Sequence, residues 1–235
     1  MRMNRILLYF GHHGIWRTGH RVIHAACNRA FPYHTFAVMW MPALFIPGPT
    51  NSASGRFQIR RLSPDEAFNV SRLPGTGMPE RYVEDALARG DECLGVMIHD
   101  EPACVSWYAR RMPVALYRWW NVEFPSDYVY VHGAYTSPAH RGKRLLEQNL
   151  HAAVTLYASA GATDLFALVE SSNYASLNAF RRAGYAHRAT IRTAKVGGRF
   201  FARHDAESLN ARVSVTPRAN PEAAKPSGES VRDAA

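Results

Sequence analysis

The chain has 235 residues, 47% of them apolar and 20% charged, which is enough for one substantial core or two small ones. No apolar run approaches ~20 residues, the length of a membrane-spanning helix, and Ile6 to Phe10 is too short for a secretory signal. Cys27, Cys93 and Cys104 follow neither a disulfide framework nor a metal-site spacing. We therefore expect a cytoplasmic protein without a metal.

Most of the formal net charge of +9 lies in the first quarter of the chain, because eight arginines precede the first acidic residue, Asp65. The other 20 basic residues are balanced by 19 acidic ones. The basic segment is suited to an acidic partner such as acyl carrier protein, RNA or anionic lipid, or it is a solvated face without a partner. The eight are Arg2, Arg5, Arg17, Arg21, Arg29, Arg56, Arg60 and Arg61.

Residues 1–55 are interpreted as a basic amino-terminal extension. Helical spacing from Ile15 to Phe31 predicts a helix that ends at Pro32. His20 and His24 are four residues apart, but no third ligand is indicated, so we interpret them as surface or core side chains. Tyr33 to Ile46 is apolar and interrupted by prolines, which indicates an edge strand or a hydrophobic flap.

The main domain is predicted at residues 56–205, after a linker rich in Pro, Gly, Ser and Asn. Its first elements are expected to be a strand at 57–62, a helical stretch from Ser63 that is interrupted at 74–79 and resumes to Ala88, and a hairpin of strands at 93–98 and 103–110 around residues 99–102.

Arg111 to Asp127 concentrates large apolar side chains beside arginines. Indole and guanidinium faces can build an acceptor pocket for an aromatic or acidic molecule. The same side chains can instead be core or dimer contacts, so a homodimer is an alternative. The set comprises Met112, Leu116, Tyr117, Trp119, Trp120 and Phe124, beside Arg110, Arg111 and Arg118.

The stretch from Tyr128 to Tyr185 has the clearest organisation. Strand spacing gives way at Ser137-Pro138 to a basic turn, and apolar residues then recur at helical spacing as far as Gly161. The elements expected are a strand at 128–136, a turn at 140–144, a helix from 145, a buried strand at 164–170, and a helix from Asn173 to Ala183 closed by Gly184.

The turn before the helix is suited to an anion. The first N–H groups of a helix lack intrahelical partners and lie at the positive end of its dipole, so they can hold a group such as pyrophosphate. Arg141, Lys143 and Arg144 add positive charge. The alternative is a solvated basic turn that opens an ordinary helix.

Two ordered motifs in this stretch resemble those of the GNAT superfamily of acyl-CoA N-acyltransferases. Thr136 to Lys143, TSPAHRGK, resembles the acyl-CoA signature of the family, and Asn173 to Tyr185, NYASLNAFRRAGY, resembles its later segment. The resemblance implies an α/β (mixed α+β) fold with a central, mostly antiparallel sheet flanked by helices, here with an extra amino-terminal helix and strand. It implies acetyl-CoA, or another acyl-CoA, held by Thr136, Arg141, Gly142, Lys143, Arg144, Leu145, Leu146 and Asn173.

The chain departs from the family pattern at three positions. Arg144 stands where Gly is usual, and Leu146 where Gly or Ala is usual; those small residues let backbone approach the pyrophosphate closely. Arg144 can replace that approach with a charge-assisted contact. Phe180 stands where a Tyr is often assigned as the acid that protonates the departing thiolate.

The residues expected to carry catalysis lie on the strand at 128–136. His132 occupies a region where related enzymes often place a carboxylate base, and its ordinary pKa of about 6.5 suits proton acceptance, directly or through water. The alternative is a histidine that merely lines the cleft. Tyr135 is the first candidate acid, and Tyr157 and Tyr174 are others. A thiolate also leaves tolerably well unassisted.

The function expected is transfer of an acetyl or other acyl group from coenzyme A to a primary amine of a small molecule or a protein. Two alternatives stay open. One is a long-chain N-acyltransferase that uses acyl carrier protein, and the other is a GNAT-fold binding protein without turnover. After strands at 185–196 and 199–203, residues 206–235 lose apolar periodicity and are interpreted as a disordered tail.

Overall fold

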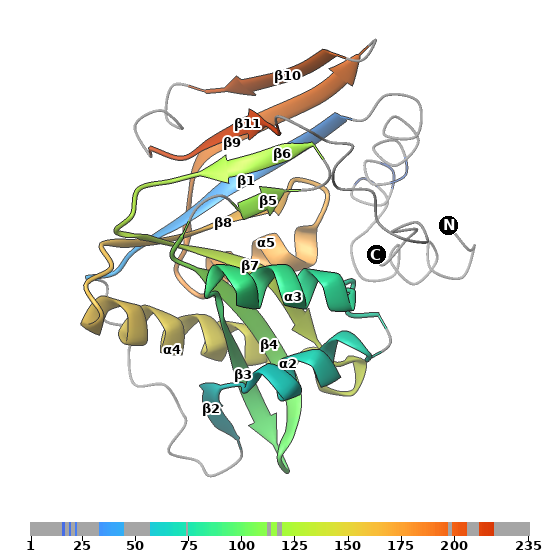
Figure 1. Ribbon diagram of the computed structural model, residues 1–235, viewed down its shortest axis with the longest axis vertical. Helices are drawn as coiled ribbons and strands as arrows, with labels where there is room; N and C mark the ends of the chain where they lie inside the picture. The colour runs from blue at the N-terminus through green and yellow to red at the C-terminus, as the bar shows by residue number, and fades with distance from the viewer. Residues whose placement is uncertain are drawn as a thin grey trace.

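A computed structural model describes residues 33–44, 57–73, 75–111, 114–116, 119–196, 199–205 and 212–218, together with Trp16, Gly19 and Val22. Eight of the described strands form one sheet in the order β10-β9-β1-β8-β7-β4-β3-β2, shown in Figure 1. All of its neighbouring pairs are antiparallel except the parallel pair β7 and β8. The strands are β1 Tyr33–Pro42, β2 Gln58–Arg61, β3 Glu92–Ile98, β4 Glu101–Ala109, β7 Tyr128–Thr136, β8 Asp164–Glu170, β9 Ala186–Val196 and β10 Arg199–His204.

Helices cover both faces of this sheet. The helices are α2 Pro64–Ser71, α3 Glu80–Arg89, α4 Leu145–Ser159 and α5 Tyr174–Arg182, with a short 3-10 turn, η2, at Pro138–His140. Side chains alternate along each strand, so β4 sends Trp107 into the cluster under α2 and α3 and Tyr108 into the cluster under α4 and α5. The mixed, mostly antiparallel fold predicted from the sequence is confirmed (Figure 1).

β1 is an interior strand, and the expectation of an edge strand or flap is wrong. It pairs with β8 on one side, where Met39 lies opposite Ala167, and with β9 on the other, where Phe36 lies opposite Ile191. Phe36, Val38 and Met39 are each at most 1% exposed. Pro42 is tolerated because it is the last residue of the strand. Tyr33–Pro42 is therefore part of the core.

A second, small sheet has the order β11-β6-β5 and consists of β5 Val114–Leu116, β6 Trp120–Glu123 and β11 Ser214–Pro217. Trp120 and Phe124 are buried beside Phe166 and Ile191 of the main sheet, so the core reading of this insertion holds for these two side chains. Met112, Tyr117 and Arg118 lie outside the described residues.

β11 corrects the expectation of a disordered tail for part of its length. Val213 and Val215 are each 2% exposed, and β11 pairs with β6 from Ser214 opposite Glu123 to Pro217 opposite Trp120. The segment is too short to show apolar periodicity, and its strand conformation depends on a partner about 90 residues earlier. Residues 206–211 and 219–235 lie outside the described part.

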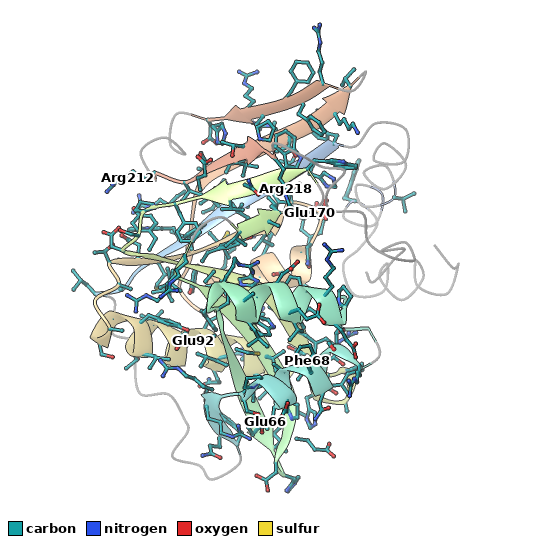
Figure 2. The ribbon with its side chains drawn as sticks, in the orientation of Figure 1. Glu66, Phe68, Glu92, Glu170, Arg212 and Arg218 are labelled. Atoms are coloured by element: carbon teal, nitrogen blue, oxygen red, sulfur yellow. The ribbon has the colours of Figure 1, made fainter. Side chains whose placement is uncertain are left out.

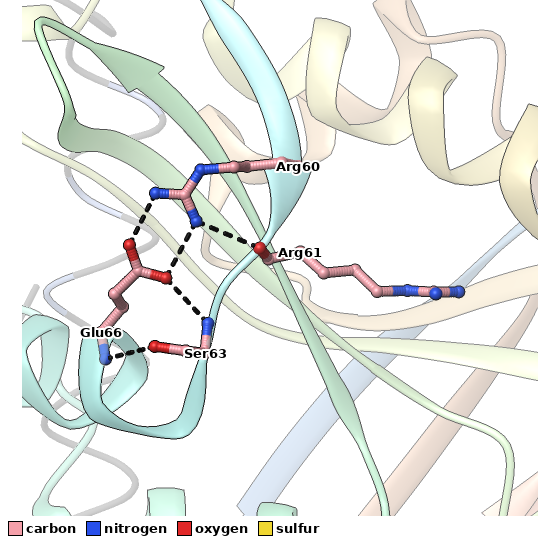
Figure 3. A network of polar contacts seen from close by, with 4 residues as sticks. All are labelled: Arg60, Arg61, Ser63 and Glu66. Atoms are coloured by element: carbon pink, nitrogen blue, oxygen red, sulfur yellow. Dashed lines mark hydrogen bonds and ion pairs between the residues drawn. The ribbon is translucent and has the colours of Figure 1, made fainter.

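α2 begins with a capping box that also ties it to the edge strand β2. The Ser63 hydroxyl accepts from the Glu66 N–H, and the Glu66 carboxylate accepts from the Ser63 N–H (Figure 3). Arg60 donates to both Glu66 oxygens, at 2.6 and 2.8 Å, and holds the pKa of this carboxyl down at about 2. Figure 2 shows Glu66 and Phe68 on this helix.

Local signals placed the other boundaries closely. α3 ends at Gly90, which takes a left-handed conformation with φ 82°, as its sequence position predicts. The β3–β4 hairpin turns on His99 and Asp100, both with positive φ, so residues 101 and 102 belong to β4 and not to the loop. β9 and β10 pair as expected, and residues 197–198 between them are outside the described part.

Two expectations for the amino terminus lie largely outside the described residues. Of the helix expected at 15–31, Trp16, Gly19 and Val22 are described and all three are helical. His20 and His24 are not described. Within the described part of the chain, no helix has both the length and the apolar character to cross a membrane.

Candidate active site

β7 and β8 diverge at the middle of the sheet. They pair in parallel only from Tyr128 opposite Asp164 to Val131 opposite Ala167. β7 continues to Thr136 along β4, whereas β8 continues to Glu170 along β1. The carboxyl ends of the two strands therefore diverge, and from His132 onwards one edge of β7 is not paired with β8. A split of this kind offers backbone N–H and C=O groups to an extended ligand.

A β-bulge lies at the start of this split. Trp107 of β4 is opposite His132 and Val105 is opposite Tyr135, so Ser106 faces both Gly133 and Ala134. Gly133 has φ 56°. A Cβ atom at this position would collide with the Tyr82 hydroxyl and lie 3.0 Å from Trp107 Cδ1, so both backbone and space require glycine.

Three polar side chains from different elements meet beside the bulge. The His132 Nε2 atom lies 3.1 Å from the Asp91 Oδ2 atom, and the His132 Nδ1 atom is hydrogen-bonded to the Tyr82 hydroxyl. Tyr82 is on α3, Asp91 lies just before β3, and His132 is on β7. We call these residues the Asp91–His132–Tyr82 chain.

The end of α3 fixes the position of Asp91. Gly90 reverses the backbone, and the Asp91 N–H donates to the Ala86 carbonyl at 2.9 Å. Arg89 Nη2 lies 2.6 Å from Asp91 Oδ2, and the Asp91 side chain is 1% exposed. The buried Asp91 carboxylate pairs with the Arg89 guanidinium, so it serves as the anionic end of the chain.

Hydrogen-bond capacity fixes the tautomer of His132. An ionised Asp91 only accepts, so Nε2 carries the proton; neutral Nδ1 then accepts, and the Tyr82 hydroxyl donates to it. Burial lowers the pKa of His132, a shift that the Asp91 contact opposes and Arg89 reinforces. His132 is thus a neutral, oriented imidazole and a proton acceptor on the Tyr82 side.

The sequence pointed to His132 but missed its partners. Tyr82 has helical spacing that explains it as a packing residue, and Arg89 and Asp91 stand at an ordinary helix end. The available signal was an acidic residue immediately before an apolar strand and after a helix-terminating glycine. That signal gives no information on which distant side chain the carboxylate meets.

The candidate acids differ in position. Tyr135 is 7% exposed and packs under α2 and α3 on the same face of β7 as His132, and its catalytic role stays a prediction. The Tyr157 hydroxyl donates to Glu92 at 2.6 Å, at the far end of the sheet, and α4 places it about 18 Å from the start of that helix. Tyr157 is therefore remote from the split.

Phe180 is buried against Tyr185, and Tyr174 packs against the same core.

The basic turn after β7 is exposed and leads into an uncapped helix. Arg141 to Arg144 are exposed, and the Arg144 side chain makes no capping hydrogen bond to α4. Arg144 takes a left-handed conformation with φ 57°, which explains why the family usually has glycine at this position. Lys143 donates to His140 at 3.1 Å.

Thr136 presents backbone groups to the split. The Ser137 N–H donates to Ala103 of β4 at 2.9 Å, so the Thr136 carbonyl, on the other side of that peptide, points away from β4. Arg141 Nε approaches this carbonyl at 3.4 Å. The Thr136 hydroxyl contacts Cys104 on the sheet face instead.

The remaining predicted donor residues lie at the same edge of the sheet. Leu145 is buried against Val96 and Cys104, and Leu146 packs partly against the same cluster, so both anchor the first turn of α4. Asn173 is the N-cap of α5, and its side-chain oxygen accepts from Ser176 at 3.2 Å. It follows β8, across the split from Thr136. Ligand contact by these residues stays a prediction.

A cavity of about 400 Å³ lies at the opposite ends of the strands from Thr136, and Gly90, next to Asp91, is among its lining residues. It is lined by Arg61, Arg110, Arg111 and Glu92, among others. It lies near the start of β7, and the nine residues of that strand put it about 25 Å from Thr136. Figure 2 shows Glu92 beside α4.

Comparisons with known proteins agree with this architecture. Residues 74–185 match the acetyltransferase (GNAT) family. A crystal structure of a Drosophila protein is 20% identical, with a TM-score of 0.52 over 76% of this chain and 57% of that chain. A GCN5-related N-acetyltransferase from Sphaerobacter thermophilus is 14% identical, with a TM-score of 0.49 over 77% of this chain and 56% of that one. No curated protein matches.

The chain thus spans just over half the length of these two solved structures. The family match covers the segment from the end of α2 to Tyr185, which includes both motifs, the bulge and the split. The sequence-based prediction of a GNAT-type acetyltransferase is confirmed at the level of the family. Residues 74–185, just under half of the chain, match the acetyltransferase (GNAT) family.

Proposed function

We propose that this protein transfers an acyl group, most often acetyl, from coenzyme A to a primary amine. The observation that carries the proposal is the position of the Asp91–His132–Tyr82 chain. It lies beside the Gly133 bulge, where β7 leaves β8. A neutral, oriented proton acceptor thus lies beside the free edge of β7, along which an extended thioester can pair.

The donor is proposed to lie along the free edge of β7. Thr136 would pair with the pantetheine arm as a neighbouring strand would, and Asn173 would approach it from the other side of the split. The pyrophosphate would bind the N–H groups and cationic side chains at Arg141 to Leu146, where α4 begins without a side-chain cap from Arg144.

The reaction forms a C–N bond and breaks the C–S bond of the thioester. The amine must be neutral to attack, and it loses one further proton as the amide forms. His132 accepts that proton, and Asp91 stabilises the resulting imidazolium. The thiolate, with an ordinary pKa of about 8.5, departs and is protonated.

The acceptor is proposed to be a small-molecule or protein amine in the cytoplasm. The Arg-rich amino-terminal segment makes acyl carrier protein an alternative source of the acyl group, because that segment carries the excess positive charge. This alternative predicts transfer from an acyl carrier protein and weaker use of acetyl-CoA.

Calorimetry with coenzyme A tests the donor site. Gly142 has φ 77° and Gly161 has φ 81°, and neither has a neighbouring atom within 4 Å of an added Cβ. Gly142→Val and Gly161→Val therefore impose the same backbone strain at the two ends of α4. Loss of affinity in the Gly142 variant alone is expected. Equal affinity in both folded variants would reject the assignment of the turn.

Intact mass spectrometry tests transfer. The protein is incubated with a panel of primary amines and with acetyl-CoA, longer acyl-CoAs or acyl carrier protein, and acylated products are identified by mass. His132→Gln should lower the transfer rate by about 10²-fold with little change in coenzyme A affinity. Donor binding without transfer to any amine would favour the binding protein without turnover.

A further inference from the structure

We propose that the Tyr82 hydroxyl, rather than His132 itself, contacts the acceptor amine and passes its proton to His132. The inference rests on the proposed function. It follows from the connectivity of the Asp91–His132–Tyr82 chain, in which the histidine is the middle member and the tyrosine is the outer one.

His132 has no ring nitrogen available to an amine. Nε2 is directed at Asp91 and Nδ1 at Tyr82, and the His132 side chain is 7% exposed. Its ring is also enclosed by aromatic neighbours: Trp107 and Tyr130 stack on it with centroids 6.3 and 5.6 Å away. A proton can therefore reach this imidazole through Tyr82 without breaking the packing around it.

Tyr82 stands where a reacting group would be. Its hydroxyl lies against Gly133, since a Cβ atom on that residue would collide with it. Gly133 is the first residue of the bulge, two positions beyond the last β7–β8 pair. The ring is held edge-on to Trp107 and His132, at 84° and 63°. Tyr82 is half-buried, and its hydroxyl is the end of the chain that lies against the bulge.

The proton transfer balances as a two-step relay. An N–H bond of the attacking amine breaks as a lone pair of the Tyr82 oxygen takes that proton. The original Tyr82 O–H bond breaks as His132 Nδ1 takes its proton, which leaves a neutral phenol and an imidazolium beside Asp91. Run in reverse, the same path delivers a proton to the departing thiolate, a role that Phe180 cannot fill.

The surroundings of Tyr82 keep its hydroxyl protonated, which suits a proton relay. Burial raises the pKa of Tyr82 well above its ordinary value, and Tyr130, Asp91 and Cys93 raise it further, while Arg89 lowers it. Tyr82 therefore remains a phenol at neutral pH. Two of these groups, Asp91 and Arg89, also act on the pKa of His132.

Steady-state kinetics of three variants test the relay. Tyr82→Phe keeps the ring and removes the hydroxyl, His132→Gln removes the acceptor, and the double variant removes both. Each single change should lower kcat by about 10²-fold, with coenzyme A affinity unchanged, and the double variant should lose no more than one of them. Independent losses that multiply would overturn the inference, and so would a wild-type rate and pH profile in Tyr82→Phe.

Tyr185→Phe is the matched control. The Tyr185 hydroxyl is buried and has no hydrogen-bond partner among the described residues, and the side chain lies in the core on the other face of the sheet. The Tyr185→Phe variant should transfer the acyl group at the wild-type rate. Wild-type transfer together with an active Tyr82→Phe would refute the relay while the proposed function stands; no transfer by wild-type protein to any amine would refute the function.

Nuclear magnetic resonance tests the hydrogen bonds without turnover. Long-range ¹H–¹⁵N spectra should show His132 as the Nε2–H tautomer in the wild-type protein. Tyr82→Phe should raise the pKa of His132, because the neutral ring loses the donor at Nδ1. The Nδ1–H tautomer, or a His132 titration that is identical in both proteins, would overturn the relay even if no acceptor amine had been found.

Discussion

His132 of β7 lies 3.1 Å from Asp91, the residue that follows the end of α3 and precedes β3. The pair is buried, and burial lowers the pKa of His132 below its ordinary value of about 6.5. The unfolded chain therefore binds the His132 proton at a higher pH than the folded protein does. This relationship has a consequence for stability.

We expect the free energy of unfolding to fall as the pH drops below about 6.5, because the folded state resists protonation of His132. The contribution is fully present above the unfolded pKa and is lost as the pH falls toward the folded pKa. Urea unfolding of wild-type protein and His132→Gln should show a difference that changes by at most about 1.4 kcal/mol per pH unit. A difference independent of pH between 7.5 and 5 would contradict the shift.

Gly133→Ala should be more destabilising than an equivalent change elsewhere. Both Gly133 and Gly161 have positive φ, which costs an alanine about 1 kcal/mol, but Gly133 is also crowded by Tyr82 and Trp107. Overpacking adds about 1–3 kcal/mol. Urea unfolding should therefore give a loss near 1 kcal/mol for Gly161→Ala and a clearly larger one for Gly133→Ala. Equal losses would show that the bulge tolerates a side chain.

A chain that ends at residue 211 should be less stable than one that ends at Arg218. The shorter chain lacks β11 and the buried side chains Val213 and Val215, each worth about 1.5–3 kcal/mol. The loss should therefore be about 3 kcal/mol or more in chemical unfolding. The chain ending at Arg218 serves as the control and should melt near the full-length protein. Indistinguishable melting temperatures for the two chains would show that β11 adds nothing.

Met39→Lys should prevent stable folding, whereas Leu44→Lys should be nearly neutral. Met39 is 0% exposed in the interior strand β1, and Leu44 is 91% exposed two residues after that strand ends. A buried, unpaired ammonium costs several kcal/mol, while surface changes usually lie within about 0.5 kcal/mol. Circular dichroism and the soluble yield measure both variants. A folded, soluble Met39→Lys protein would argue against β1 as an interior strand.

The sequence by itself determined the elements whose signals are local. The periodicity from Leu145 predicted α4, the Asn173 cap predicted α5, and Gly90 predicted the end of α3, because each depends on residues within one or two turns. Both family motifs are also local, because each is a short run of consecutive residues. The sequence also placed His132 on the strand that carries the candidate site.

Only the tertiary structure decided the position of β1 and the partners of His132. The residues of a strand alone do not indicate whether it lies at an edge or in the interior of a sheet. β1 is interior because β8 and β9, more than 120 residues away in sequence, pair with its two edges. Tyr82 and Asp91 reach His132 from 50 and 41 residues away. Such contacts depend on how α3, β3 and β7 pack together. The spacing of neighbouring residues in the sequence does not indicate that packing.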